Sequence, residues 1–205
     1  MKTNALIIFT RNPQLGKVKT RLAKTIGDEK ALKVYTDLLA HTMNVTKRLT
    51  CDKFVFYDER IVNNDGWADN LFFKRKQLGV DLGARMQHAF EQLFEMGYQK
   101  CIIIGSDLFD LSANHIQEAF QKLDNADVVL GPAEDGGYYL LGLKKVIPSV
   151  FINKHWGTSS VLTDTLKDLE NHQVECIETL NDIDTFEDLE KSKYYQKRQQ
   201  PNGKV

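Results

Sequence analysis

The chain has 205 residues and a formal net charge of −1, with 42% hydrophobic and 27% charged residues. These values are ordinary for a globular protein with enough apolar residues for a substantial core. They exclude an overall electrostatic attraction to nucleic acid or to a membrane surface, so any anion site must come from local clustering of cations.

The cysteines and the N-terminal residues point to the cytoplasm. Cys51, Cys101 and Cys176 are odd in number and have no CxxC spacing, which favours reduced thiols over a disulfide framework or a zinc site. The apolar run at residues 5–9 is too short for a signal peptide or a membrane span. We therefore expect a cytoplasmic protein with no membrane insertion and no nucleic-acid partner. A homodimer is left open.

Apolar runs of strand length alternate with helical patterns along the chain. Strands are predicted at residues 5–10, 53–57, 71–77, 101–105, 127–130, 138–143 and 174–177, and helices at about 28–49, 82–94, 112–123, 160–171 and from 185. This alternation predicts an α/β fold: a mixed, mainly parallel sheet with helices on both faces. We expect one domain over residues 1–190, followed by a polar, disordered tail at 191–205.

Four cations directly follow the first predicted strand. They are Arg11, Lys17, Lys19 and Arg21, and Gly16 lies among them. In open α/β sheets, ligands bind beyond the carboxyl ends of the strands. Cations around a glycine at such a strand end favour a phosphate-binding loop, although the segment matches neither the P-loop nor GxGxxG. The alternative is a solvated basic loop.

Acidic residues at two places predict a site for Mg²⁺ or Mn²⁺. Asp107 follows Gly105 and Ser106 at the end of the clearest central strand, and Asp182 and Asp184 precede the last predicted helix. Magnesium is commonly held by one or two carboxylates together with substrate phosphates. Asp107 is the first expected ligand, and Asp184 or Asp182 the second. The alternatives are a helix cap or turn for Asp107 and a favourable helix-dipole interaction for the later acids.

The segment Asp135-Gly136-Gly137-Tyr138 lies between two apolar runs. Two adjacent glycines beside an acid allow a ligand to come close to the backbone, because glycine has no side chain and tolerates positive φ. The segment is therefore predicted to bind an acceptor molecule. The alternative is a hairpin turn, for which Asp-Gly between apolar runs is a typical signal.

Two further patterns are less specific. Gln77 would read the edge of a nucleobase, with Gly83 allowing close approach and Arg85 reaching a phosphate. The alternative is an amphipathic helix with one exposed arginine. Trp156 and Thr158, in a segment of one aromatic, one glycine and three hydroxyls, suit an acceptor pocket with an aromatic wall. The alternative places Trp156 in the core.

Taken together and in this order, the motifs resemble a known protein family. They are PxxGxVKTRL at residues 13–22, GSD at 105–107, GPAEDGGYY at 131–139, WGT at 156–158 and DIDT at 182–185. They are similar to those of the rSAM/selenodomain-associated transferase 1 proteins of the nucleotide-diphospho-sugar transferase (GT-A) superfamily. The resemblance spans about residues 5–190.

This resemblance implies a GT-A fold, which binds a nucleotide at the first half of its sheet and an acceptor at the second. By the same resemblance, Lys19 and Arg21 hold phosphates, Asp107 and Asp184 hold the metal, and residues 135–138 face the acceptor.

The leading hypothesis is a magnesium-dependent glycosyltransferase with a nucleotide-sugar donor and a small-molecule acceptor. Lys19, Arg21 and Asp135 are the candidate catalytic residues, because such chemistry depends on positioning and on neutralising phosphate charge. One alternative is a nucleotidyltransferase that joins a nucleoside triphosphate to a phosphorylated acceptor and releases pyrophosphate; the basic loop favours it. Another is a non-catalytic nucleotide-binding protein.

Overall fold

The computed structural model describes residues 3–199. One sheet of seven strands has the order β3-β2-β1-β4-β6-β5-β7. Its strands are β1 (Asn4–Thr10), β2 (Asp52–Tyr57), β3 (Phe73–Lys76), β4 (Lys100–Gly105), β5 (Val128–Pro132), β6 (Tyr138–Leu143) and β7 (Val174–Cys176). β6 is antiparallel to both of its neighbours, and all other pairs are parallel. The predicted mixed, mainly parallel sheet is confirmed.

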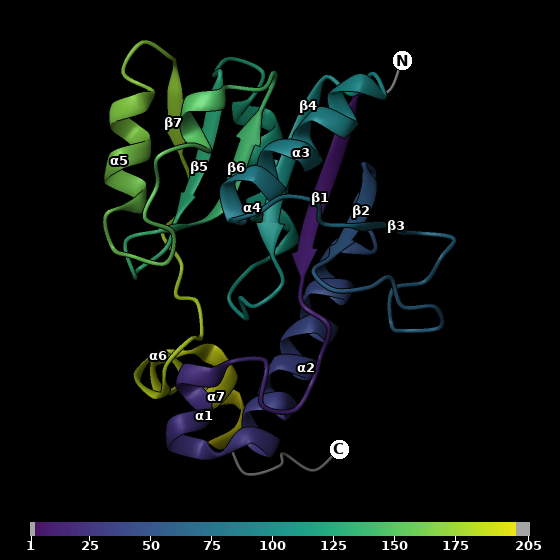
Figure 1. Cartoon of the computed structure of the whole chain (residues 1–205), viewed down its shortest axis with the longest axis vertical. Coiled ribbons are helices and arrows are strands. Elements are labelled where there is room, and N and C mark those ends of the chain that lie inside the picture. Colours follow the sequence, from purple (N-terminus) through teal and green to yellow (C-terminus); the bar gives the residue numbers. More distant parts are fainter. Residues whose placement is uncertain (1–2, 200–205) are drawn as a thin grey trace.

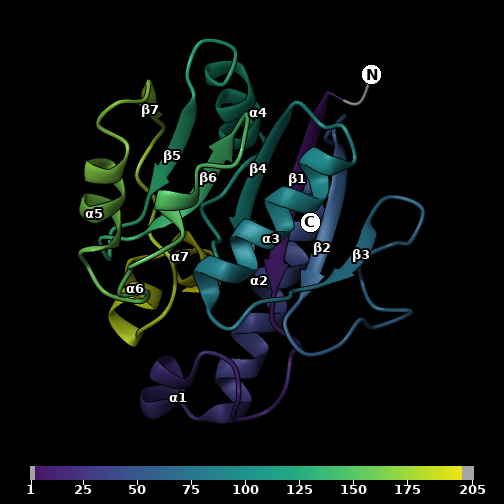
Figure 2. The ribbon, with the colours of Figure 1, turned by 45° about the horizontal axis from the view of Figure 1, so that its top comes forward.

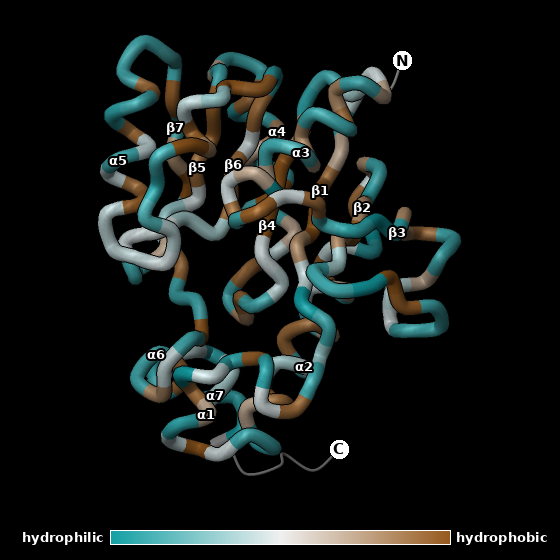
Figure 3. The backbone as a smooth tube through the Cα atoms, in the orientation of Figure 1, coloured by the Kyte–Doolittle hydropathy of each residue, from teal (hydrophilic) through white to brown (hydrophobic). Residues whose placement is uncertain are grey.

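Helices cover both faces of the sheet (Figure 1). α2 (Asp28–Thr46) and α4 (Ala113–Lys122) pack on one face, and α3 (Leu82–Glu95), the short 3₁₀ helix η1 (Pro148–Val150) and α5 (Val161–Asp168) pack on the other. In β1, Leu6 and Ile8 face the first layer, whereas Ala5 and Ile7 face the second. A strand buried on both faces reads as a continuous apolar run, which is why β1 was recognisable. Figure 3 shows hydrophobic residues following the central strands.

A third group of helices lies beyond the carboxyl end of β1 (Figures 1 and 2). It consists of α1 (Thr20–Ile26), α6 (Phe186–Lys191), α7 (Lys193–Gln199) and the first half of α2. We call this group the helical lobe. Its own small core contains Leu22, Ala31, Val34, Leu38, Ile183, Leu189 and Tyr194. The lobe therefore joins residues from the two ends of the chain.

The prediction of a disordered tail is wrong for residues 193–199, which form α7. The Tyr194 side chain is buried, its hydroxyl donates a hydrogen bond of 2.8 Å to Asp37, and its ring packs edge-on against Phe109. Tyr194 and Tyr195 supply the apolar contacts of this helix, although most of its other residues are polar. The rest of the expected tail, residues 200–205, lies outside the described residues. Within residues 3–199, no helix has the length and apolarity to span a membrane.

Candidate active site

Two adjoining cavities lie at the carboxyl ends of the strands. The larger, of about 710 Å³, opens between the sheet and the helical lobe, and we call it the basic cleft. The chemically important residues on its walls are Arg11, Lys19, Arg21, Asp58, Gln77, Arg85, Asp107, Asp135 and Asp184. The smaller, of about 220 Å³, we call the aromatic pocket because Tyr138, Tyr139 and Trp156 line it. Asp107 and Asp135 line both cavities.

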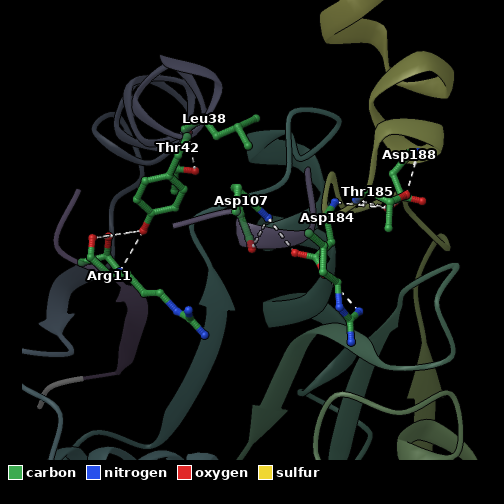
Figure 4. A network of polar contacts seen from close by, with 11 residues as sticks. Arg11, Leu38, Thr42, Asp107, Asp184, Thr185 and Asp188 are labelled. Atoms are coloured by element: carbon green, nitrogen blue, oxygen red, sulfur yellow. Dashed lines mark hydrogen bonds and ion pairs between the residues drawn. The ribbon is translucent and has the colours of Figure 1, made fainter. Parts of the chain in front are cut away.

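Lys19 lies at the centre of the contact between sheet and lobe. It is the N-cap of α1 and has a left-handed backbone with φ of 49°. Its side chain is only 4% exposed, and its Nζ lies 2.9 Å from Asp107 Oδ2 and 3.9 Å from Asp184 Oδ1. Arg21 Nη1 lies 3.2 Å from Asp184 Oδ2. Figure 4 shows these carboxylates on two sides of one amino group. Charged residues far apart in sequence therefore meet here.

Lys19 and Asp107 favour each other's charged forms, although the Lys19 side chain is buried. Burial by itself would lower the pKa of Lys19, but the charge and hydrogen bond of Asp107, with Asp184 beyond, raise this pKa above its usual value. Burial would raise the pKa of Asp107, but Lys19 and then Arg11 hold it below its usual range. Each partner thus favours the charged form of the other.

Hydrogen bonds hold the start of the loop after β1 in place. We call this loop, residues 11–21, the basic loop. The Tyr35 hydroxyl accepts from the Arg11 backbone N–H at 2.8 Å and donates to the Arg11 carbonyl at 3.1 Å. The Asn12 backbone N–H donates to Asp58 at 2.8 Å, and the Asn12 side chain bonds to the backbone of Arg60. The Arg11 side chain remains exposed in the cleft. This loop is therefore a fixed platform for its cations.

Gly105 allows Asp107 to fold back over the end of β4. A Cβ at Gly105 would lie 2.8 Å from Asp107 Oδ1, which is closer than real Cβ atoms come. Glycine at position 105 therefore leaves room for the Asp107 carboxylate, which faces Lys19 rather than capping a helix. The N-cap of the following helix, α4, is Ser112.

The Asp-Gly-Gly-Tyr segment is both the predicted turn and part of the site. It connects β5 to β6 as a hairpin, so the alternative interpretation is correct for its backbone. Asp135 Oδ1 accepts a hydrogen bond of 2.8 Å from the Gly137 N–H, and Asp135, Gly137 and Tyr138 line the aromatic pocket. Gly136 lines neither cavity. Its φ is +90°, and a Cβ there would lie 2.4 Å from the Ser159 carbonyl oxygen, so this glycine admits the neighbouring loop rather than a ligand.

The two acids before α6 lie in different cavities. Asp184 lines the basic cleft with Lys19 and Arg21, whereas Asp182 lines the aromatic pocket. Burial, followed by the charges of Asp135 and Asp107, raises the pKa of Asp182 to about 7. The Thr185 side chain caps α6 by accepting from the Asp188 N–H at 3.3 Å, which makes Asp188 structural. Of the two candidate second ligands, Asp184 is the one beside the cations.

Several residues predicted to bind the nucleotide have other contacts. Lys17 lies outside both cavities and pairs with Glu59 at 3.5 Å. Gly16 also lies outside both cavities. Gly83 is buried, and a Cβ there would lie 2.0 Å from the Phe151 carbonyl oxygen, so it serves the packing of α3. None of these three residues lines either cavity, so their predicted contact with a nucleotide stays a prediction.

Two further predicted residues line the basic cleft, but some of their nitrogen atoms already donate hydrogen bonds to backbone carbonyls. Gln77 Nε2 donates to the Thr10 and Phe56 carbonyls at 3.1 and 2.9 Å, which leaves only its oxygen for a nucleobase. Arg85 Nε donates to the Gly79 carbonyl at 3.2 Å. Its other guanidinium nitrogens make no hydrogen bond within residues 3–199.

The aromatic pocket contains residues that the sequence did not single out. Trp156 and Thr158 line it as predicted, and Trp156 packs edge-on to Tyr138 with ring centres 6.5 Å apart. The unpredicted lining residues are Leu82, Met86, Leu108, Tyr139 and Val161. In the basic cleft, Tyr35 and Asp58 were also missed. Asp58 directly follows β2, so the strand-end rule would have found it; Tyr35 looked like an ordinary helix core residue.

The carboxylates suit a hard divalent cation. Asp107 and Asp184 approach the same Lys19 amino group, and their side chains are 38% and 39% exposed. Among residues 3–199, no three His, Cys, Asp or Glu side chains form a metal-binding group by themselves. Two carboxylates that leave positions for phosphate oxygens are the arrangement that Mg²⁺ prefers, so these residues fit such an ion.

Two solved structures that are similar to this chain are transferases by name. One from Desulfovibrio desulfuricans G20, provisionally named a nucleotide-diphospho-sugar transferase, has a TM-score of 0.84 and 30% identity, covering 94% of this chain and 92% of that chain. A Methanothermobacter nucleotidyl transferase has a TM-score of 0.65 and 11% identity, covering 95% and 98%. The GT-A fold and the expectation of a transferase agree with both, whereas the rSAM-associated label stays a prediction.

A third similar structure contains a metal. Rv0371C from Mycobacterium tuberculosis H37Rv, in complex with manganese, has a TM-score of 0.53 and 11% identity, covering 93% of this chain and 97% of that chain.

No curated protein matches this chain. A family described as an uncharacterised protein conserved in bacteria, DUF2064, matches residues 41–158. The chain belongs to the DUF2064 family.

Proposed function

We propose that this chain is a glycosyltransferase that binds a nucleotide-sugar in the basic cleft and an acceptor in the aromatic pocket. The observation that carries the proposal is the meeting of Lys19, Arg21, Asp107 and Asp184 in the basic cleft, where Asp107 also lines the aromatic pocket. A diphosphate lying in the cleft would find cations on both walls. A sugar attached to it would point towards Asp135, which lines both cavities.

The cations would stabilise the departing nucleoside diphosphate. Arg11, Lys19, Arg21 and Arg85 line the basic cleft, and charge-assisted hydrogen bonds to phosphate oxygens are stronger than neutral ones. Positioned charges of this kind supply much of the rate of phosphate-leaving reactions. Because Lys19 is held by two carboxylates, it is already oriented before a substrate arrives.

Asp107 and Asp184 would hold Mg²⁺ or Mn²⁺; the manganese complex of the similar Rv0371C supports the use of a divalent ion, though not these particular residues. When bound, such an ion neutralises phosphate charge. Asp135 would orient the acceptor hydroxyl and take its proton. A bond then forms between the acceptor oxygen and the anomeric carbon of the sugar, the bond from that carbon to the diphosphate breaks, and the diphosphate keeps the electron pair.

Nucleotidyl transfer is the second candidate. Four cations in one cleft suit a triphosphate, which carries more charge than a diphosphate-sugar, and the similar Methanothermobacter structure is a nucleotidyl transferase. In this reaction, an acceptor phosphate attacks the α-phosphorus of a nucleoside triphosphate and pyrophosphate departs. The two candidates therefore release different products.

A thermal-shift panel of nucleotides and nucleotide-sugars, with and without Mg²⁺ or Mn²⁺, tests the proposal. A ligand at about 100 times its dissociation constant stabilises the folded protein by about 2.7 kcal/mol. Any ligand that raises the melting temperature is then assayed for product. Release of a nucleoside diphosphate supports glycosyl transfer, and release of pyrophosphate supports the second candidate. Absence of metal-dependent binding across the panel contradicts both.

A further inference from the structure

The aromatic pocket differs in charge from the basic cleft beside it. It is lined by three carboxylates, those of Asp107, Asp135 and Asp182. Among the described residues that line it, there is no lysine, arginine or histidine. The four cations Arg11, Lys19, Arg21 and Arg85 line only the basic cleft, and Lys19 is paired with Asp107.

This lack of cations bears on what can enter the pocket. A phosphate group brings one to two negative charges and needs cationic or N–H partners when it leaves water. Even if a metal ion engages Asp107, the carboxylate of Asp135 remains on the wall, and Asp182 offers a phosphate no positive charge. Like charges brought together in a partly desolvated site cost several kcal/mol. A phosphorylated acceptor is therefore disfavoured.

The remaining walls are apolar. Side chains of Leu82, Met86, Leu108, Tyr138, Trp156 and Val161 contribute to the lining. Leu108 and Val161 are buried, and the half-buried Trp156 rests where Gly83 leaves room for its ring. Aromatic and aliphatic walls with few polar groups at one end are typical of pockets that bury an apolar body and orient a single polar group.

We infer that the acceptor is an alcohol with an apolar body and no negative charge, whose hydroxyl lies beside Asp135. The inference rests on the proposed function, because it takes the basic cleft as the donor site. Asp135 Oδ1 accepts from the Gly137 N–H, whereas Oδ2 has no hydrogen-bond partner within residues 3–199 and is open to a hydroxyl. Such an acceptor serves glycosyl transfer, whereas nucleotidyl transfer to a phosphate ester would require an anion in this pocket.

The two tryptophans of the chain provide a direct binding test. Trp156 lines the pocket, whereas Trp67 is buried in the core on the other face of the sheet. The indole N–H signals of the full chain are followed by NMR during titration with benzyl alcohol or benzyl phosphate. Excess pyrophosphate is present to occupy the basic cleft, and a Trp156→Phe variant assigns the signal.

Benzyl alcohol is expected to shift the Trp156 signal and leave that of Trp67 in place. Benzyl phosphate is expected to need at least about tenfold higher concentration, which corresponds to about 1.4 kcal/mol. Equal or tighter binding of benzyl phosphate overturns the inference, and so does the absence of any shift with benzyl alcohol. Neither result depends on the thermal-shift panel, so the acceptor inference can fail while the donor site stands.

A charge added to the pocket sharpens the test. Leu82→Lys places an amino group on a partly exposed position that lines both cavities. It is expected to raise the ratio of benzyl phosphate affinity to benzyl alcohol affinity about three- to fivefold, in the range of a partly exposed ion pair. Val80→Lys is the matched control, because Val80 is 94% exposed, two residues away, and lines neither cavity. An equal effect of both substitutions would show that long-range charge, not the pocket, decides.

Discussion

The loops at the carboxyl ends of the strands, which we call the sheet edge, and the helical lobe form the two sides of the basic cleft. These two regions are built differently. The sheet edge presents Asp107 and Asp135 on loops that leave strands buried on both faces. The lobe presents Lys19, Arg21 and Asp184 on short segments held by a small core of their own. Each strand of the sheet is encoded by a local run of apolar residues. The core of the lobe, by contrast, forms only when residues from the two ends of the chain pack together.

Both polar and aromatic contacts cross this boundary. Lys19 of the lobe bonds to Asp107 of the sheet edge, and Phe109 reaches back from the same loop to Tyr194. Buried charge pairs contribute little net stability but strongly fix geometry when hydrogen-bonded. We therefore expect substitutions at the boundary to affect activity first, and substitutions within the sheet edge to affect stability first.

Replacing the bridging cation should have the largest effect. Lys19→Met is expected to reduce transfer by about 100- to 1000-fold, the range for loss of one positioned charge donor. The measurement is initial rate with the donor found in the thermal-shift panel. Lys17→Met is the matched control: it removes the same charge two residues away, outside both cavities, and should retain activity within about twofold. Equal losses in the two variants would argue for a general loop charge.

Removing the lobe carboxylate should weaken metal binding. Asp184→Asn is expected to lower Mn²⁺ affinity in the presence of nucleotide by about tenfold or more, since an amide oxygen carries no net charge. Calorimetric titration measures this affinity. Glu187→Gln, an exposed acid in the first turn of α6, is the control and should bind Mn²⁺ normally. Unchanged affinity in Asp184→Asn would remove this residue from the metal site.

A glycine of the sheet edge should matter for stability. Gly136→Ala is expected to lower the free energy of unfolding by about 2–3 kcal/mol, because a positive φ is strained and the new Cβ would meet the Ser159 carbonyl. Gly97→Ala has nearly the same φ, +90°, but no atom within 4 Å of the new Cβ. It should cost only about 1 kcal/mol in the same denaturant series. Equal costs would mean that strain alone, without the contact to the Ser159 loop, explains Gly136.

The smallest effect concerns the pH dependence of stability. The folded pKa of Asp182 is raised to about 7 from an ordinary value of 3.8. Between these values the folded state binds more protons than the unfolded state, so this group lowers stability progressively as pH rises through that range. In chelator-treated buffer, Asp182→Asn should be more stable than the parent above pH 7, by about 1 kcal/mol after allowing for solvent screening, and equal to it near pH 4. A difference that does not change with pH would contradict the raised pKa.

The strands and main helices could be predicted from the chain because their signals are local. β1 and β4 are uninterrupted apolar runs, and α3 has an apolar face at helical spacing. The rule that ligands bind at strand carboxyl ends then pointed to Arg11 and Asp107, and the adjacent glycines pointed to Asp135. That rule could not distinguish Lys17 from Lys19, since both follow β1 at nearly the same distance. In the structure, Lys19 has a left-handed backbone and its side chain is buried against Asp107, whereas Lys17 lies beside Glu59.

The sequence by itself determined the sheet, its helical layers and the strand ends where charged residues gather. Apolar runs and helical spacing are visible among neighbouring residues, so these elements can be recognised locally. Tertiary structure decided which charges meet. Asp184 reaches Lys19 because Ile183 and Leu189 pack with Leu22 and Leu38 in the core of the lobe. It also decided that Gly83 and Gly136 serve packing rather than ligand binding, since their close neighbours lie far away in sequence. Such choices depend on contacts between distant segments, which no local pattern encodes.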